Sequence, residues 1–218
     1  MNTLPPIPPN PASTSKHGFR RFYRASVQVP SIIDLPVMNY IMVDGSGEPR
    51  ASLQYREAIA ALRGVAKALR VRAKRITGKT FAELPLEGLW WFSDGHDHAP
   101  RHSRDIKWTL MIMQPPLINA AMFDQVAEEF QDRHAFAALS EMRFQAVDEG
   151  RCVQLMHEGA YATERTTLDR LYEFMRERDM KFNGPHHEIY LTDPATTPQA
   201  DLRTIVRQPV RMLVAITV

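Results

Sequence analysis

Short apolar runs and longer amphipathic stretches alternate along the chain. Glycine, proline, aspartate or asparagine bounds most of the apolar runs, which predicts strands at 38–43, 89–93, 108–113, 152–157, 188–192 and 204–218. We expect the last strand to be interrupted at Gln208-Pro209, and 141–148 to form a hairpin with 152–157. Apolar residues at helical spacing predict helices over 52–75, 119–135 and 163–178. This mixture indicates an α+β fold.

The order of these elements repeats once. Residues 38–115 and 140–218 each run strand, glycine-containing turn, helix, strand, strand, and the helix over 119–135 connects them. Aligning the strands of the two halves equates Trp91 with Tyr190 and Leu89 with Glu188. Two such modules, related by a pseudo-two-fold axis, predict antiparallel sheets around a central ligand cleft. We expect the two modules to form one domain over 19–218.

The strand at 188–192 carries the candidate site. Strand alternation puts Glu188 and Tyr190 on one face and Ile189 on the other, where it can pack against helices. The predicted cleft is lined by aromatic and methionine side chains and by one carboxylate: Trp91, Tyr190, Tyr161, Trp108, Met111, Met113 and Glu188. Rings stack on flat molecules, methionine adapts to them, and a carboxylate pairs with a cation. A hydrophobic, aromatic or cationic ligand is therefore expected.

Simpler interpretations of the same residues remain open. Glu188 on a surface strand would be merely solvated, and the tryptophans and methionines would then be ordinary core residues. The histidines of the 94–103 loop (His96, His98 and His102) have no Glu or Cys at ligand spacing, so no metal and no other cofactor is expected. The glycines after residue 43 lack the spacing of a nucleotide motif and indicate a strand-to-helix turn.

Composition restricts the class of protein. The chain has 218 residues, of which 44% are hydrophobic and 24% charged, with a formal net charge of +2, as in an ordinary globular protein. The single Cys152 suits a reducing compartment, and no signal peptide or membrane span is evident. We expect a cytoplasmic protein, monomeric or homodimeric, without a nucleic-acid or membrane partner. The proline-rich residues 1–18 are expected to be disordered.

Four ordered stretches resemble one known family. They are Met-Asn-Tyr-Ile-Met-Val-Asp-Gly-Ser-Gly-Glu-Pro (38–49), Pro-Leu-Glu-Gly-Leu-Trp-Trp (85–91), Val-Gln-Leu-Met-His-Glu-Gly-Ala-Tyr (153–161) and His-His-Glu-Ile-Tyr-Leu-Thr-Asp-Pro (186–194). Together they are similar to the GyrI-like small-molecule-binding proteins, which are related to the effector-binding domains of BmrR- and Rob-type regulators. The resemblance covers roughly 20–212 and implies two strand–helix–strand–strand modules around a ligand cleft.

The resemblance also implies roles for individual residues. The family's acidic residue matches Glu188 and its neighbouring aromatic matches Tyr190. Its His-x-Gly-Pro-Tyr motif matches His157, Gly159 and Tyr161, with an alanine in place of the proline. The Trp90-Trp91 pair resembles the longer, stand-alone branch, which includes hydrolases that open the cyclopropane of DNA-alkylating cyclopropanoid natural products. We expect both tryptophans and His157 to contribute to ligand binding.

Three classes of function follow. The first is a detoxifying protein that binds and sequesters hydrophobic, aromatic or cationic small molecules. The second is a metal-independent cyclopropanoid hydrolase, in which Glu188 orients or deprotonates water while Tyr190 or Tyr161 donates a hydrogen bond to the oxygen that gains charge. The third is a protein that acts on another protein, for which the sequence shows no exposed apolar or acidic run. Binding and catalysis use the same residues, so the sequence does not separate the first two.

Overall fold

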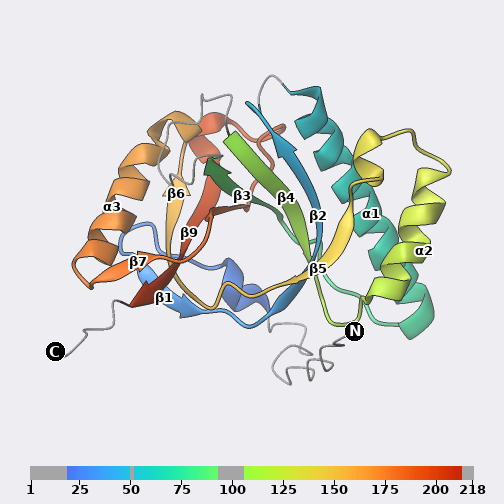
Figure 1. Cartoon of the computed structure of the whole chain (residues 1–218), viewed down its shortest axis with the longest axis horizontal. Helices are drawn as coiled ribbons and strands as arrows, with labels where there is room; N and C mark the ends of the chain where they lie inside the picture. Colours follow the sequence, from blue (N-terminus) through green and yellow to red (C-terminus); the bar gives the residue numbers. More distant parts are fainter. Residues whose placement is uncertain (1–18, 50–51, 93–105, 213–218) are drawn as a thin grey trace, which may run out of the picture.

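A single curved sheet with helices on one side forms the body of the molecule (Figure 1). The computed structural model describes residues 19–49, 52–92 and 106–212, so the tail over 1–18 and the three loop histidines lie outside the described residues. Within these ranges, nine strands pair antiparallel: β1 (Ser31–Asp34), β2 (Met38–Ser46), β3 (Leu86–Phe92), β4 (Ile106–Gln114), β5 (Arg143–Val147), β6 (Arg151–Glu158), β7 (Met180–Phe182), β8 (His186–Tyr190) and β9 (Arg203–Met212). The helices are α1 (Leu53–Thr77), α2 (Ala120–Gln131) and α3 (Glu164–Arg176). The predicted α+β class is confirmed.

The strand order shows the internal duplication directly. The sheet runs β1-β6-β9-β8-β3-β4-β2-β5, and β7 pairs with β9. If β1 is exchanged with β5, β2 with β6, β4 with β9 and β3 with β8, the result is the same strand order read from the other edge of the sheet. The pseudo-two-fold axis therefore passes between β8 and β3 at the sheet centre. One strand of each half pairs with the other half: β1 pairs with β6, and β5 pairs with β2. The hairpin predicted between 141–148 and 152–157 is therefore wrong, because β5 and β6 lie near opposite edges of the sheet.

The register of the two halves is fixed by a pair of equivalent hydrogen bonds. Gly47 N donates to Ile106 O at 2.8 Å, and Gly159 N donates to Leu202 O at 2.9 Å. Both glycines have positive φ, 85° and 114°, at the turn that leads from a strand toward a helix. Following the strand pairings from these two points equates Trp90 with Tyr190.

The predicted equivalence of Trp91 with Tyr190 is therefore wrong by one residue. A slip of one residue along a strand moves the side chain to the other face of the sheet. Trp90, with Gly88 and Leu86, lies on the face of Glu188 and Tyr190, whereas Trp91 and Leu89 lie on the opposite face.

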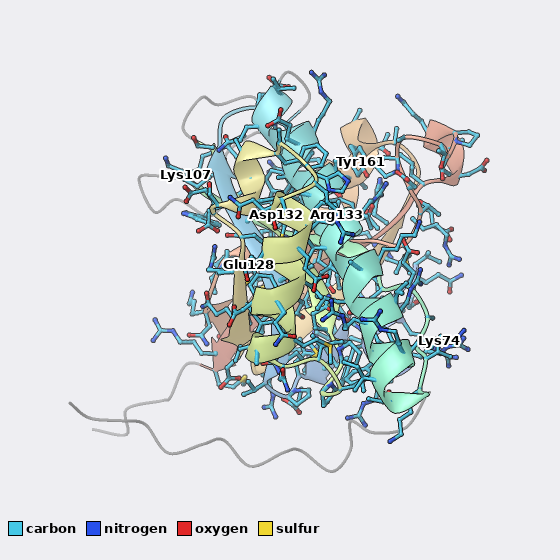
Figure 2. The ribbon with its side chains drawn as sticks, turned by 90° about the vertical axis from the view of Figure 1, so that its right-hand side faces the viewer. Lys74, Lys107, Glu128, Asp132, Arg133 and Tyr161 are labelled. Atoms are coloured by element: carbon cyan, nitrogen blue, oxygen red, sulfur yellow. The ribbon has the colours of Figure 1, made fainter. Side chains whose placement is uncertain are left out.

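The helices cover one face of the sheet and leave its centre between them (Figure 1). Ser52 caps α1 by accepting a hydrogen bond from Tyr55 N, and Gly78 ends it in a left-handed conformation. The inner stripe of α1 is fully buried on the first half: Ala58, Ala61, Leu62, Val65 and Leu69. Asn119 caps α2 as predicted. Figure 2 shows α2 beside α1 with Glu128 on its outer surface, and Phe130 of α2 lies against Gly64.

Helix α3 covers the second half in the same way. Its Leu171 and Met175 pack against Leu155 of β6 and Val206 of β9, all of them buried. Strand β9 runs without interruption from Arg203 to Met212, so the break predicted at Gln208-Pro209 does not occur. The pairing of the two halves at β3 and β8 thus places the centre of the sheet between α1 and α3.

Candidate active site

Glu188 lies at the centre of the sheet, on the face that carries the helices. Its neighbour in β9 is Val206, which packs under α3, and its neighbour Tyr190 packs in the cluster under α1. We call the central part of this face, formed by His186, Glu188, Tyr190, Gly88 and Trp90, the site face. Glu188 is 1% exposed, so a solvated surface position is ruled out.

Two neighbours on the same strand hold the Glu188 carboxylate. The Tyr190 hydroxyl donates a hydrogen bond of 2.8 Å to Oε2, and His186 Nε2 lies 3.4 Å from Oε1. Residues two apart in a strand share a face, which is why this triplet converges. Each oxygen of the carboxylate therefore faces a different polar group, and Tyr190 orients the acid from the side of α1.

Gly88 gives the aromatic rings room to meet over the sheet. It is the residue of β3 opposite Glu188, and a Cβ atom there would lie 2.9 Å from Trp90 Nε1 and 3.2 Å from the Tyr190 hydroxyl oxygen. Any side chain at this position would displace one of the two rings. The pseudo-equivalent residues Trp90 and Tyr190 thus approach each other above a glycine at the symmetry axis.

Further aromatic rings extend this group on both sides. Tyr161, in the turn before α3, meets Tyr190 edge to face with ring centroids 6.3 Å apart. Tyr55 of α1 lies 6.2 Å from Trp90 and 5.2 Å from Trp108. Tyr161, Tyr55 and Trp90 are half-buried, as expected for side chains that border a binding site. Tyr161 therefore points at the site face although an alanine replaces the proline of the family motif.

His157 supports Tyr161 from below. Its Nε2 lies 3.1 Å from Ala160 O and its Nδ1 lies 2.9 Å from Thr167 Oγ1. A carbonyl oxygen only accepts hydrogen bonds, so Nε2 carries the hydrogen in the first contact. His157 is 4% exposed and joins the turn before α3 to that helix. Its contacts position the turn that presents Tyr161.

Of the remaining residues expected at the site, three are buried in packed regions, whereas Trp91 is half-buried and lines a hollow on the opposite face of the sheet. Trp108 is on the helix-covered face but fully buried, with its ring against Gly45. Met111 and Met113 are 0% and 1% exposed and pack on the opposite face, in the same cluster that Trp91 contacts. The expectation that Trp91 and Glu188 share a face is wrong, for the register reason given above.

A cavity of about 330 Å³ opens beside Tyr190. Tyr190 forms part of its wall, together with α1, the connection from α1 to β3 and the ends of β4 and β8. Its volume lies at the lower end of the range for small-molecule sites. Tyr190 lines the cavity and its hydroxyl contacts Glu188, whereas Glu188 itself does not line the cavity.

The opposite face of β8 carries a buried charged network that the sequence did not indicate. His187 is fully buried, with Nδ1 2.9 Å from Glu149 Oε1 and Nε2 2.9 Å from Glu87 Oε2. Carboxylates accept hydrogen bonds, so both ring nitrogens carry hydrogens and the ring is cationic. Burial alone would lower the pKa of His187, but Glu149 and Glu87 outweigh it and raise that pKa to about 9.

This network also holds the chain that precedes β1. The Tyr23 hydroxyl donates to Glu87 Oε1 at 2.8 Å, and the buried Arg207 donates to Phe22 O and to Gln154 Oε1. Two acids and two bases balance the buried charge: Glu87, Glu149, His187 and Arg207. We assign the network a structural role, in which it fixes β8 from behind.

Two negative findings apply to the parts of the chain that the structure describes. No cluster of three or more His, Cys, Asp or Glu residues there has the arrangement of a metal site. None of the described helices is long and apolar enough to cross a membrane.

Comparison with known proteins identifies the family. The GyrI-like small molecule binding domain matches residues 28–211. A conserved protein from Listeria innocua has 28% identity and a TM-score of 0.80, and a hydrolase from Listeria innocua has 29% identity and a TM-score of 0.77. In each case the match covers 90% of this chain and 98% of the other.

More distant matches show the fold alone. The EcmrR C-terminal domain has 11% identity and a TM-score of 0.52, with 84% of this chain and 98% of that domain covered. No curated protein matches the chain. The duplicated fold with Glu188 at its centre and the family match over 28–211 lead to one conclusion: this chain belongs to the GyrI-like small-molecule-binding domain family.

Proposed function

We propose that this protein is a hydrolase that adds water to the strained ring of a planar electrophile, such as the cyclopropane of a cyclopropanoid DNA-alkylating compound. The observation that carries the proposal is the buried Glu188 carboxylate, which accepts a 2.8 Å hydrogen bond from the Tyr190 hydroxyl beneath aromatic rings. The similarity to a Listeria innocua hydrolase over 90% of the chain supports the proposal and favours hydrolysis over simple sequestration.

Glu188 is the general base in this proposal. A carboxylate that is shielded from bulk water is a strong hydrogen-bond acceptor, and it can take a proton from a water molecule held within hydrogen-bond distance. One oxygen of Glu188 receives the proton of a water molecule as the water oxygen bonds to a ring carbon. Tyr190 and His186 keep the carboxylate oriented, which lowers the cost of reaching the reactive geometry.

A tyrosine hydroxyl stabilises the charge that ring opening produces. The carbon–carbon bond of the cyclopropane breaks, and its electron pair moves through the conjugated ring system to a carbonyl oxygen. Tyr190 or Tyr161, whose rings meet edge to face, donates a hydrogen bond to that oxygen, and a proton from solvent completes the phenol. Glu188 then releases its proton to solvent. In the net reaction one water is consumed, the cyclopropane carbon–carbon bond and one water oxygen–hydrogen bond break, and one carbon–oxygen bond and the oxygen–hydrogen bond of the phenol form.

The surrounding rings select the substrate. Trp90, Tyr161 and Tyr55 offer half-buried aromatic surface next to Glu188, on which a flat molecule can stack. Glu188 is 1% exposed, so the substrate must approach past Tyr190, which borders the 330 Å³ cavity. His157 acts indirectly, because it holds the turn that presents Tyr161.

Product mass and ligand binding, measured together, test the proposal. We expect the wild-type protein to convert a cyclopropanoid alkylator to a product heavier by one water. Glu188→Gln should still bind the compound, seen by quenching of tryptophan fluorescence, without converting it. Binding by both proteins without conversion by either would contradict hydrolysis and leave sequestration of the compound as the function.

A further inference from the structure

The cavity beside Tyr190 has a polar side formed by one helix. Arg63, Lys67 and Arg70 of α1 all line it, and their spacing of four and three residues puts them on one face of the helix. The apolar residues that line the cavity are Ala66 of the same helix and, from other elements, Phe81, Leu84, Pro85, Leu86 and Ile112. The cavity therefore combines apolar walls with a row of cationic side chains from α1.

Two of these three cations are already paired. Arg63 Nη1 lies 2.7 Å from Asp193 Oδ2, and Arg70 Nη2 lies 3.2 Å from Glu83 Oε2; both acids also line the cavity. Arg63 holds the pKa of Asp193 below its usual value, so this carboxylate stays charged. Lys67 lies between the two pairs and has no carboxylate partner among the described residues. The charged groups around the cavity thus leave an excess of one positive charge, at Lys67.

A buried acceptor completes the polar side. Gln114 at the end of β4 is 3% exposed and lines the cavity. Its Nε2 donates to Ile112 O at 3.2 Å, whereas Oε1 has no hydrogen-bond partner among the described residues. Leaving a buried acceptor unpaired costs about 1–3 kcal/mol, so a polar donor is expected opposite it.

The fold itself does not require an amide at this position. Leu110 of β4 pairs with Gly88, and Val206 of β9 pairs with Glu188, so Leu110 and Val206 are equivalent in the two halves. Counting four residues onward along each strand equates Gln114 with Val210. Val210 is buried in the apolar cluster under α3. One half of the molecule therefore fills this place with valine, whereas the other half has a glutamine that lines a cavity.

We propose that this cavity binds the non-reacting part of the substrate. That part is a flat apolar group with an N–H or O–H donor facing Gln114 and an anionic group facing Lys67. The reacting end lies past Tyr190, at Glu188. That the cavity binds part of the substrate rests on the proposed hydrolase function. That the cavity binds a ligand of this chemistry does not depend on whether the protein is an enzyme. It changes the expected ligand from a cation to a planar organic acid.

Two related dyes test the site. Anilinonaphthalene sulfonate combines aromatic rings, one N–H donor and one negative charge, and N-phenylnaphthylamine has the same skeleton without the charge. Both are titrated by fluorescence into the wild type, Lys67→Glu, Gln114→Val and the matched control Lys74→Glu. Lys74 is exposed near the end of the same helix, away from the residues that line the cavity (Figure 2).

Lys67→Glu should weaken the sulfonate at least about tenfold and the neutral amine less than about twofold, because only the sulfonate loses a charge-assisted contact. Gln114→Val should weaken both dyes about three- to tenfold, since both carry the N–H group. Lys74→Glu should leave both within about twofold. Equal effects of Lys67→Glu on the two dyes, or of Lys67→Glu and Lys74→Glu on the sulfonate, would overturn the proposal. So would unchanged affinities in Gln114→Val.

The outcome is independent of catalysis. Glu188→Gln should bind both dyes like the wild type, because Glu188 does not line the cavity. Charge-dependent dye binding without any hydrolysis would support the ligand site and contradict the proposal that its ligand is the substrate. Hydrolysis that depends on Glu188, without charge-dependent dye binding, would overturn the proposed site and leave the proposed function intact.

Discussion

Gly88 lies directly opposite Glu188 in the pairing of β3 with β8, at the pseudo-two-fold axis of the molecule. The duplication brings two equivalent strand positions together at the centre of the sheet. One carries the carboxylate, and the other carries no side chain. The asymmetry creates a single acid with room above it, and the aromatic residues of both halves, Trp90 and Tyr190, occupy that room.

A methyl group at Gly88 should separate the two rings. In Gly88→Ala, the added Cβ would lie 2.9 Å from Trp90 Nε1 and 3.2 Å from the Tyr190 hydroxyl oxygen. We expect a loss of about 1–3 kcal/mol in the free energy of unfolding, measured by urea denaturation, as for other overpacked sites. Trp90→Phe removes the indole nitrogen that is closest to the new methyl. The double variant should therefore lose less stability than the sum of the single variants. Additive losses would show that the methyl is accommodated elsewhere.

The Tyr190 hydroxyl should matter for turnover more than for folding. Tyr190→Phe removes the donor of the 2.8 Å hydrogen bond to Glu188 and keeps the ring that packs against Tyr161. We expect kcat for a cyclopropanoid substrate to fall about 10- to 100-fold, because the carboxylate loses the donor that orients it. Tyr161→Phe serves as the comparison. If its kcat falls further than that of Tyr190→Phe, Tyr161 is the donor to the substrate and Tyr190 only orients Glu188.

The buried network behind β8 should make stability depend on pH in the alkaline range. The pKa of His187 is raised from 6.5 to about 9 in the folded protein, so its stabilisation is complete below pH 6.5 and lost as pH rises through 9. The difference is on the order of 3 kcal/mol. Urea unfolding at the two ends of this range should show the loss in the wild type.

His187→Gln provides the control for that pH dependence. It should be less stable at every pH, because Glu87 and Glu149 then remain buried with one cation fewer. Its unfolding free energy should change much less between pH 6.5 and 9 than that of the wild type. Equal pH dependence in the two proteins would mean that His187 is not the group that titrates.

The sequence predicted the architecture better than the register. Alternation along 188–192 and the ordered repeat were sufficient for the α+β class, the duplication and the pairing of Glu188 with Tyr190. The predicted equivalence of Trp91 with Tyr190 was wrong because the Gly and Asp residues that bound a strand locate it only to within one residue. A shift of one residue moves each side chain to the other face of the sheet. Trp90 thus takes the place expected for Trp91.

Contacts between distant residues were beyond the sequence pattern. His187 is 100 residues from Glu87 and 38 from Glu149, and only strand pairing brings them together. The cavity near Lys67 depends on how α1 and the ends of β4 and β8 are spaced, which no periodicity encodes. The adjacent His186, His187 and Glu188, alternating between two faces of one strand, were the available signal for two separate polar groups.

The most direct test of the account is the second-order rate constant, kcat/KM, for water addition to a cyclopropanoid compound in Glu188→Gln and in Glu158→Gln. Glu158 is an exposed carboxylate at the end of β6, paired with Arg203, and serves as the matched control. We predict a loss of about 10²- to 10⁴-fold for Glu188→Gln, as for removal of a general base, and a change of less than about twofold for Glu158→Gln. Retention of wild-type kcat/KM by Glu188→Gln would contradict the assignment of this buried carboxylate as the base.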